Sequence, residues 1–153
     1  YVRHEVIPHV KERSPQLLEV LGRTMNLIAD EDDMLEEMAF DLVKRHMAWT
    51  EALPDRPPAY EEGGVLAPEL GIQPVPLQRR AAVQVLQAML GPDARVETAS
   101  IDAVLAAWDA LGTPQAAPHG GYVANIQGNL AISANKRGVL VEPMSAFRAR
   151  RKK

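Results

Sequence analysis

The sequence predicts an α+β protein that is mainly helical, with a long connecting helix and a small helical domain closed by a three-stranded antiparallel meander. Two patterns indicate this class. Apolar residues recur at helical spacing over the first third of the chain, and three short β-rich pieces separated by turn residues follow at 122–142. At 153 residues, the chain is long enough for one domain with an extension.

Composition restricts the environment of the protein. The apolar fraction of 46% and the charged fraction of 24% are those of a globular chain. The sequence has no cysteine, which excludes disulfides and thiolate metal sites and favours a reducing compartment. No apolar run approaches the length of about 18 residues that a membrane span requires, and no signal peptide is visible. We therefore expect a cytoplasmic protein without a membrane partner.

The first helical segments are marked by prolines. Residues 1–13 are amphipathic and do not begin with methionine, so we expect further chain upstream. Pro8 marks a helix start or a kink, and Ser14-Pro15 is typical of a helix start, with serine as the N-cap. The helical pattern then extends to about residue 53 along a stripe of apolar residues: Leu17, Leu21, Met25, Ile28, Leu35, Met38, Leu42 and Trp49.

The stripe is interrupted by the acidic stretch at residues 29–34, where Glu31 and Asp32 replace apolar residues. Two interpretations fit. Either the helix breaks there and Asp30 caps a second helix, or one helix leaves one packing partner and reaches another. The second interpretation is preferred.

A Pro- and Gly-rich loop follows at residues 54–64, and residues 65–75 predict a turn-like connector. Pro76 opens a helix to Leu90 that ends at Gly91 and buries four residues: Leu77, Ala81, Val85 and Met89. A further helix is predicted from Ser100, its N-cap, to Leu111, with Gly112 as its stop signal.

Three β-rich pieces close the domain, and their spacing predicts an antiparallel meander. They are YVANI (122–126), LAISA (130–134) and GVLVE (138–142), separated by QGN and NKR.

No residue pattern indicates catalysis. The four histidines show no pair at helical spacing and no zinc ligand pattern, and the acidic run 30–33 is interpreted as a solvated helix face. The Gly-Gly pairs lack the context of a phosphate loop, and no nucleophile–base arrangement is detectable. The sequence therefore predicts no metal site and no cofactor site in this chain.

Basic residues are unevenly distributed. Residues 148–153 (RARRKK) contain five of the 17 basic residues, so that the rest of the chain, with 12 basic and 20 acidic residues, has a net charge of −8. An RNA-binding surface would therefore be local. The candidates are Arg79-Arg80, in the first turn of a predicted helix, and Lys136-Arg137, at a predicted hairpin tip. The alternative explanations are ordinary surface arginines that pair with local acidic residues, and a charged turn. The terminal RARRKK is either a flexible anion-binding tail or a linker.

Three stretches together resemble the tRNA(Ile)-lysidine synthase family. VRHEVIPHVKERSPQLLEVLGRTMNLIADEDDMLEEMA (2–39) is similar to the segment after the catalytic domain of that family. VPLQRRAAVQVLQAMLG (75–91) is similar to its later Ala-Leu-Gln-Arg-Arg helix, and HGGYVANIQGNLAISANKRGVLVEP (119–143) to its Gly-Gly-plus-strands ending. The three stretches occur in the order of the family and cover nearly the whole chain.

The resemblance implies a domain organisation. Residues 1–13 would be the end of a catalytic domain or a linker, 14–53 the connecting helix, 65–143 a tRNA-recognition domain and 144–153 a basic tail. The PP-loop ATPase domain with its Ser-Gly-Gly-x-Asp-Ser loop is missing from the sequence. The parent enzyme, with ATP and Mg²⁺, would adenylate the wobble cytidine of isoleucine tRNA, and a lysine amine would then displace AMP.

The resemblance also implies roles for single residues. Arg3 would point back into the nucleotide site and help to neutralise phosphate charge. Gln78, Arg79 and Arg80 match the helix-opening motif and would contact tRNA or brace the fold. The sequence departs from the family at Val83, where another arginine is frequent, which weakens the case for a row of phosphate contacts.

The expected partners are isoleucine tRNA, the missing PP-loop domain and, through exposed Val2, Val6, Leu17 and Leu21, a second copy in a homodimer. Two alternatives remain open. The chain is either a helical protein-interaction module or an RNA-binding appendage of another PP-loop tRNA-modifying enzyme.

Overall fold

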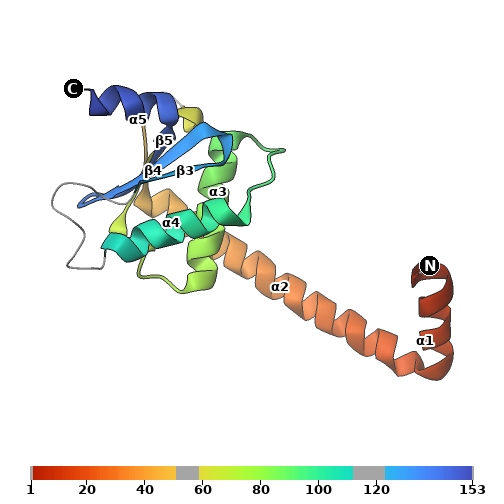
Figure 1. Cartoon of the computed structure of the whole chain (residues 1–153). Coiled ribbons are helices and arrows are strands. Elements are labelled where there is room, and N and C mark those ends of the chain that lie inside the picture. The colour runs from red at the N-terminus through yellow and green to blue at the C-terminus, as the bar shows by residue number, and fades with distance from the viewer. Residues whose placement is uncertain (1, 51–58, 112–122, 153) are drawn as a thin grey trace. The chain divides into compact units, whose positions relative to one another are not determined.

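The structure of the chain is a computed structural model that describes residues 2–50, 59–111 and 123–152. It divides into two compact units, Tyr1–Glu36 (unit 1) and Glu37–Lys153 (unit 2). Within the described residues helices predominate, and one five-stranded antiparallel sheet lies in unit 2 (Figure 1). The predicted class, α+β and mainly helical, is confirmed, but the sheet is larger than the predicted three-stranded meander.

The described residues of unit 1 are helical except for Ser14. The unit contains a π-helical segment, Val2–Val6, then α1 (Ile7–Arg13) and the first part of α2 (Pro15–His46). Pro8 lies in the first turn of α1, where a missing N–H costs no helical hydrogen bond. None of the described residues of unit 1 is buried. This unit therefore has no core of its own.

Helix α2 is continuous through the acidic stretch 29–34, so the interpretation with a break there is wrong. Its last residues belong to unit 2, where Ala39 and Leu42 are buried. The helix ends at His46, earlier than predicted, and Trp49 lies in a strand. The predicted end near residue 53 lies outside the described residues.

The sheet has the strand order β1-β2-β5-β4-β3, with every neighbouring pair antiparallel. Its strands are β1 (Met47–Trp49), β2 (Gly64–Leu66), β3 (Val123–Ile126), β4 (Leu130–Asn135) and β5 (Gly138–Pro143). The predicted meander is the β3-β4-β5 part. The sequence prediction missed β1 and β2 because strands of three residues are too short to display an alternating pattern.

Two helices of unit 2 agree with the sequence pattern. Helix α3 (Val75–Leu90) buries the four predicted residues and ends at Gly91, whose φ of 110° favours glycine. Helix α4 (Thr98–Leu111) begins two residues before Ser100, so Ser100 is not its N-cap. The Ser100 side chain is buried instead, and its Oγ accepts a hydrogen bond from the Gln127 backbone N–H at 3.3 Å. The predicted stop at Gly112 lies outside the described residues.

Helices cover both faces of the central strands. Helix α4 packs against β3, β4 and β5, whereas α5 (Met144–Arg151) packs against β4 and β5 from the other side (Figure 1). Residues Leu130–Ala134 of β4 are all buried, as expected for a strand that is covered on both faces. Ala131 clusters with Met144 and Phe147 of α5, so the α5 face carries the odd-numbered residues of β4.

The segment between the first Pro-rich loop and α3 is part of the core. Leu66 of β2 and Leu70, in a short 3₁₀ helix (Pro68–Leu70), are both fully buried. The predicted turn-like connector at 65–75 therefore contains a strand as well as turns. Among the described residues, no helix has the length and apolar character to cross a membrane.

Replacing Leu66 by alanine tests whether β2 belongs to the core. Leu66 is fully buried, so Leu66→Ala is expected to lower the free energy of unfolding by about 2–5 kcal/mol through lost burial and a residual cavity. Urea unfolding followed by tryptophan fluorescence measures the change. Ile72, which is 81% exposed in the same segment, is the matched control, and Ile72→Ala should change stability by less than about 0.5 kcal/mol. Equal losses in both variants would contradict the position of β2.

Candidate nucleic-acid interface

Helix α5 is attached to the sheet by two apolar side chains. Pro143 precedes the helix, and its fixed φ suits the residue before the first turn. Met144 and Phe147 are three positions apart, so they share one helix face, and both are buried against Ala131 of β4. The basic residues of α5 therefore belong to an ordered helix, not to a flexible tail or a linker.

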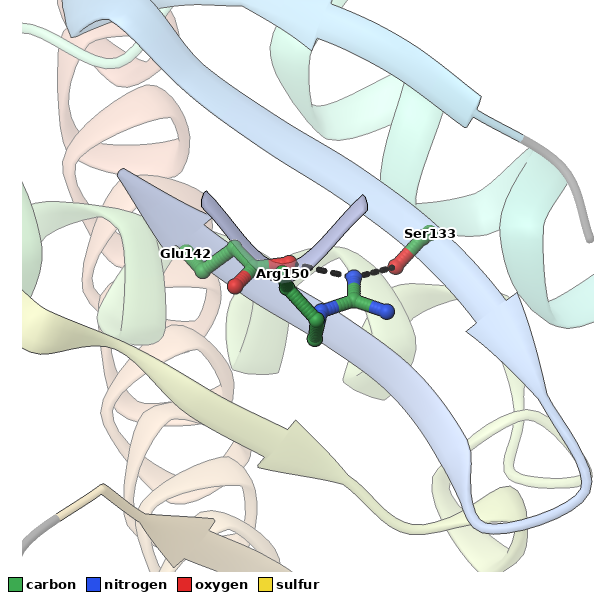
Figure 2. Close-up of polar contacts among 3 residues, drawn as sticks. All are labelled: Ser133, Glu142 and Arg150. Carbon is green, nitrogen blue, oxygen red and sulfur yellow. Dashed lines mark hydrogen bonds and ion pairs between the residues drawn. The ribbon is translucent and has the colours of Figure 1, made fainter. Parts of the chain in front are cut away.

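An ion pair fixes the other end of the helix on the sheet. Glu142 of β5 is buried, with 7% of its surface exposed, and its Oε1 accepts a hydrogen bond from Arg150 Nη2 at 2.5 Å. The same Nη2 donates a longer bond of 3.4 Å to Ser133 Oγ (Figure 2). A buried carboxylate is costly without a partner, so Arg150 is a structural residue whose charge is largely offset by Glu142.

The ring of Phe147 also contacts two guanidinium groups. The Cζ atoms of Arg150 and Arg151 each lie 5.6 Å from the ring centroid, within the range of cation–π attraction. The side chains of Arg148, Arg151 and Lys152 are exposed. The last turn of α5 thus presents cations from a helix whose orientation is fixed by burial.

The turn between β4 and β5 holds a second pair of cations. Asn135 Oδ1 accepts a hydrogen bond from the Arg137 backbone N–H at 2.8 Å, which is typical of a tight turn closed by asparagine. Gly138 follows with a φ of 133°, and a Cβ there would lie 2.0 Å from the Leu66 carbonyl oxygen. Lys136 and Arg137 are exposed at the tip of this turn.

The start of α3 separates the roles of three predicted residues. Gln78 is buried, and its Nε2 donates to the carbonyl oxygens of Gly71 at 2.9 Å and Gln73 at 2.7 Å. It braces the fold instead of facing a ligand. Arg79 is exposed, whereas Arg80 is half-buried and already interacts with other residues of the chain.

The predicted site residues thus fall into three groups. Arg3 is exposed in the π-helical segment of unit 1. Arg79 and Arg80 share the first part of α3, and Lys136 and Arg137 share the β4–β5 turn. The roles assigned to these residues remain predictions.

Arg148, Arg151 and Lys152 are not among the individual site residues that the sequence predicts, because the composition of residues 148–153 indicates a tail or a linker. The spacing of Met144 and Phe147 after Pro143 is the signal that could have revealed a helix there.

The exposed side chains of Arg148, Arg151 and Lys152 offer one kind of chemistry, the binding of anions. Exposed arginine and lysine side chains bind anions by charge and hydrogen bonding. Among the described residues, no group of three or more His, Asp or Glu side chains is arranged to hold a metal ion.

Comparison with known proteins finds similarity to a curated enzyme and no family assignment. No protein-family model matches the chain. The chain is similar to a tRNA(Ile)-lysidine synthase of Geobacter sulfurreducens, with 27% identity over 105 residues. The match covers 67% of this chain and 20% of that synthase, so the chain spans about a fifth of the length of this curated relative. The motifs at 2–39, 75–91 and 119–143 resemble the same family.

Removing Arg150 tests its structural role. In Arg150→Ala the buried carboxylate of Glu142 loses its ion-pair partner, and we expect the free energy of unfolding to fall by about 1–3 kcal/mol. Urea unfolding measures the loss. Arg148→Ala removes the same charge from an exposed position of the same helix and should cost less than about 0.5 kcal/mol. If the two variants are equally stable, the Glu142 pair does not hold α5 in place.

Proposed function

We propose that this chain is the tRNA-binding portion of an ATP-dependent tRNA(Ile)-lysidine synthase, which converts the wobble cytidine of isoleucine tRNA to lysidine. The observation that carries the proposal is the similarity to the Geobacter sulfurreducens synthase over 105 residues. The ordered family motifs of residues 2–39, 75–91 and 119–143 support the same assignment.

The relative lengths of the two proteins support a division of labour. The match covers 20% of the synthase, which leaves most of that enzyme to supply other functions. In our proposal, a PP-loop domain outside this chain binds ATP and Mg²⁺ and performs adenylation and lysine transfer. Arg3 would reach the phosphates of the nucleotide, and its exposed position leaves it accessible for such a contact.

The charge distribution favours unit 2 as the part that binds tRNA. Residues 1–36 contain four basic and eight acidic residues, whereas residues 37–153 contain 13 basic and 12 acidic residues. Contacts with the RNA backbone require cations, and each contact releases counterions from the phosphates. Arg79, Lys136 and Arg137 are exposed and supply such cations from α3 and from the β4–β5 turn.

Titration with isoleucine tRNA tests this function. The chain should bind the tRNA weakly, and its affinity should fall as salt increases, because the contacts are to phosphates. With lysine, ATP and Mg²⁺ present, the chain alone should form no lysidine. Arg79→Ala should weaken binding roughly threefold or more near 0.1 M salt through loss of one phosphate contact. Fluorescence anisotropy measures both effects.

The control for this experiment is Arg23→Ala, which removes a cation of unit 1 that is paired with Glu19 at 2.6 Å. Its affinity should equal that of the unchanged chain. Absence of tRNA binding at low salt, or lysidine formation by the chain alone, would contradict the proposal.

A second candidate function is protein interaction through unit 1, which includes self-association as a homodimer. The observation that favours it is a set of large apolar side chains on unit 1, each at least 37% exposed. They are Val2, Val6, Ile7, Leu17, Val20, Leu21, Met25, Leu27, Ile28 and Met34. Exposed apolar surface of this extent is typical of a contact site.

Sedimentation velocity tests the homodimer. At high protein concentration the chain should sediment as a species larger than a monomer, because association removes the apolar side chains of unit 1 from water. Leu21→Glu should shift the distribution towards the monomer. Gln16→Glu places the same charge at an exposed polar position of α2 and should leave it unchanged. A monomer at every concentration would rule out this association.

A further inference from the structure

We propose that the exposed cations of α5 and of the β4–β5 turn form the surface that holds the RNA backbone. This α5 surface consists of Arg148, Arg151 and Lys152 together with Lys136 and Arg137. The inference rests on the proposed function and deepens it, because it assigns tRNA contacts to a helix that the family motifs at 2–39, 75–91 and 119–143 do not include.

Charge is segregated within unit 2. Residues 123–152, which form β3, β4, β5 and α5, contain six basic residues and one acidic residue. Residues 59–111, which include β2, α3 and α4, contain three basic and seven acidic residues. Since α4 and α5 cover opposite faces of the sheet (Figure 1), the α5 side of the sheet is the cationic side.

The acidic residue in this segment is already compensated. Glu142 is buried and bonded to Arg150 at 2.5 Å. Its charge therefore offsets that of Arg150 and leaves the other five cations of residues 123–152 without an acidic residue in the same segment. Phosphates approaching this side would meet a concentrated positive potential.

The register of the sheet brings the two groups of cations to the same end. Met144, at the start of α5, contacts Ala131, whereas Arg150, near its end, contacts Ser133 (Figure 2). Helix α5 therefore runs back along β4 towards the β4–β5 turn. Ser133 is two residues from Asn135, where the turn begins, a separation of about 7 Å along a strand. The last turn of α5 therefore lies nearer to the tip of the hairpin than the first turn does.

The surface is preorganised for an extended anion. The backbone of α5 is fixed by Met144, Phe147 and Arg150, and the turn is closed by the Asn135 side chain. Binding therefore orders side chains only, which reduces its entropic cost. Arginine also suits phosphate because its planar guanidinium donates two parallel hydrogen bonds.

The same helix argues against a lipid surface as the ligand. A helix that lies on a membrane inserts an apolar face between the lipids. The large apolar residues of α5, Met144 and Phe147, are each only 8% exposed because they pack on the sheet. The exposed positions are occupied by basic and small residues, including Ser145 and Ala149. No large apolar side chain of α5 is available for insertion, which favours an RNA backbone over a lipid surface as the partner of these cations.

The test is a salt series of isoleucine tRNA titrations with the triple variant R148A/R151A/K152A. Loss of these phosphate contacts should weaken binding at least tenfold near 0.1 M salt, and the slope of log K against log salt should become shallower by about two to three. Because Arg151 also contacts Phe147, the double variant R148A/K152A is measured too. It should lose at least about threefold in affinity. Urea unfolding verifies that both variants are folded.

The charge-matched control is K11A/R13A/R23A, which removes three exposed cations of unit 1 and should retain the affinity and the slope. If the unchanged chain binds tRNA and the α5 variants bind equally well, or if the control loses as much, the α5 surface is wrong while the proposed function stands. If the unchanged chain binds phosphatidylserine vesicles but no tRNA, both proposals fail.

Discussion

The fold of unit 2 depends on covering the two central strands of its sheet from both sides. Strands β4 and β5 carry apolar residues on the face towards α4, including Ile132 and Val141, and this pattern is what a two-layer protein would have. Without α5, Ala131 and the Glu142 carboxylate on the other face of these strands would be exposed to water. Helix α5 closes it by packing Met144 and Phe147 on Ala131 and by pairing Arg150 with Glu142. Burial therefore determines where the basic end of the chain lies.

The sequence reveals those elements whose periodicity is long. Helix α3 is recognisable because four inward residues and a terminal glycine agree, and the β3-β4-β5 meander because its pieces alternate with turn residues. Strands β1 and β2 have three residues each. β2 pairs with β5, a distant part of the chain, and β1 pairs in turn with β2, so neither strand depends on a local pattern. The position of Trp49 in β1 shows that tertiary pairing, not the local helical pattern, decides there.

In the candidate site, too, the sequence pattern does not reveal features that depend on contacts with distant residues. Exposed Arg79, Lys136 and Arg137 were recognisable as basic residues at a helix start and a hairpin tip, but the burial of Gln78 was not, because it depends on the carbonyl groups of Gly71 and Gln73. Residues 148–152 have the composition of a disordered tail. Their order follows from the packing of Met144 and Phe147 on Ala131 and from the bonds of Arg150 to Ser133 and Glu142. Single-sequence patterns do not encode such distant pairings.

The ring of Phe147 gives the two neighbouring arginines different freedom. Each guanidinium carbon lies 5.6 Å from the ring centroid. If Arg150 left the ring, the buried Glu142 carboxylate would lose its ion-pair partner. An exposed cation–π contact such as that of Arg151 is worth only about 0.5–1 kcal/mol. Arg151 can therefore leave the ring and adjust to the spacing of incoming phosphates while the helix stays in place. Phe147 thus keeps Arg150 in a fixed position, whereas it holds Arg151 only until a phosphate binds that arginine.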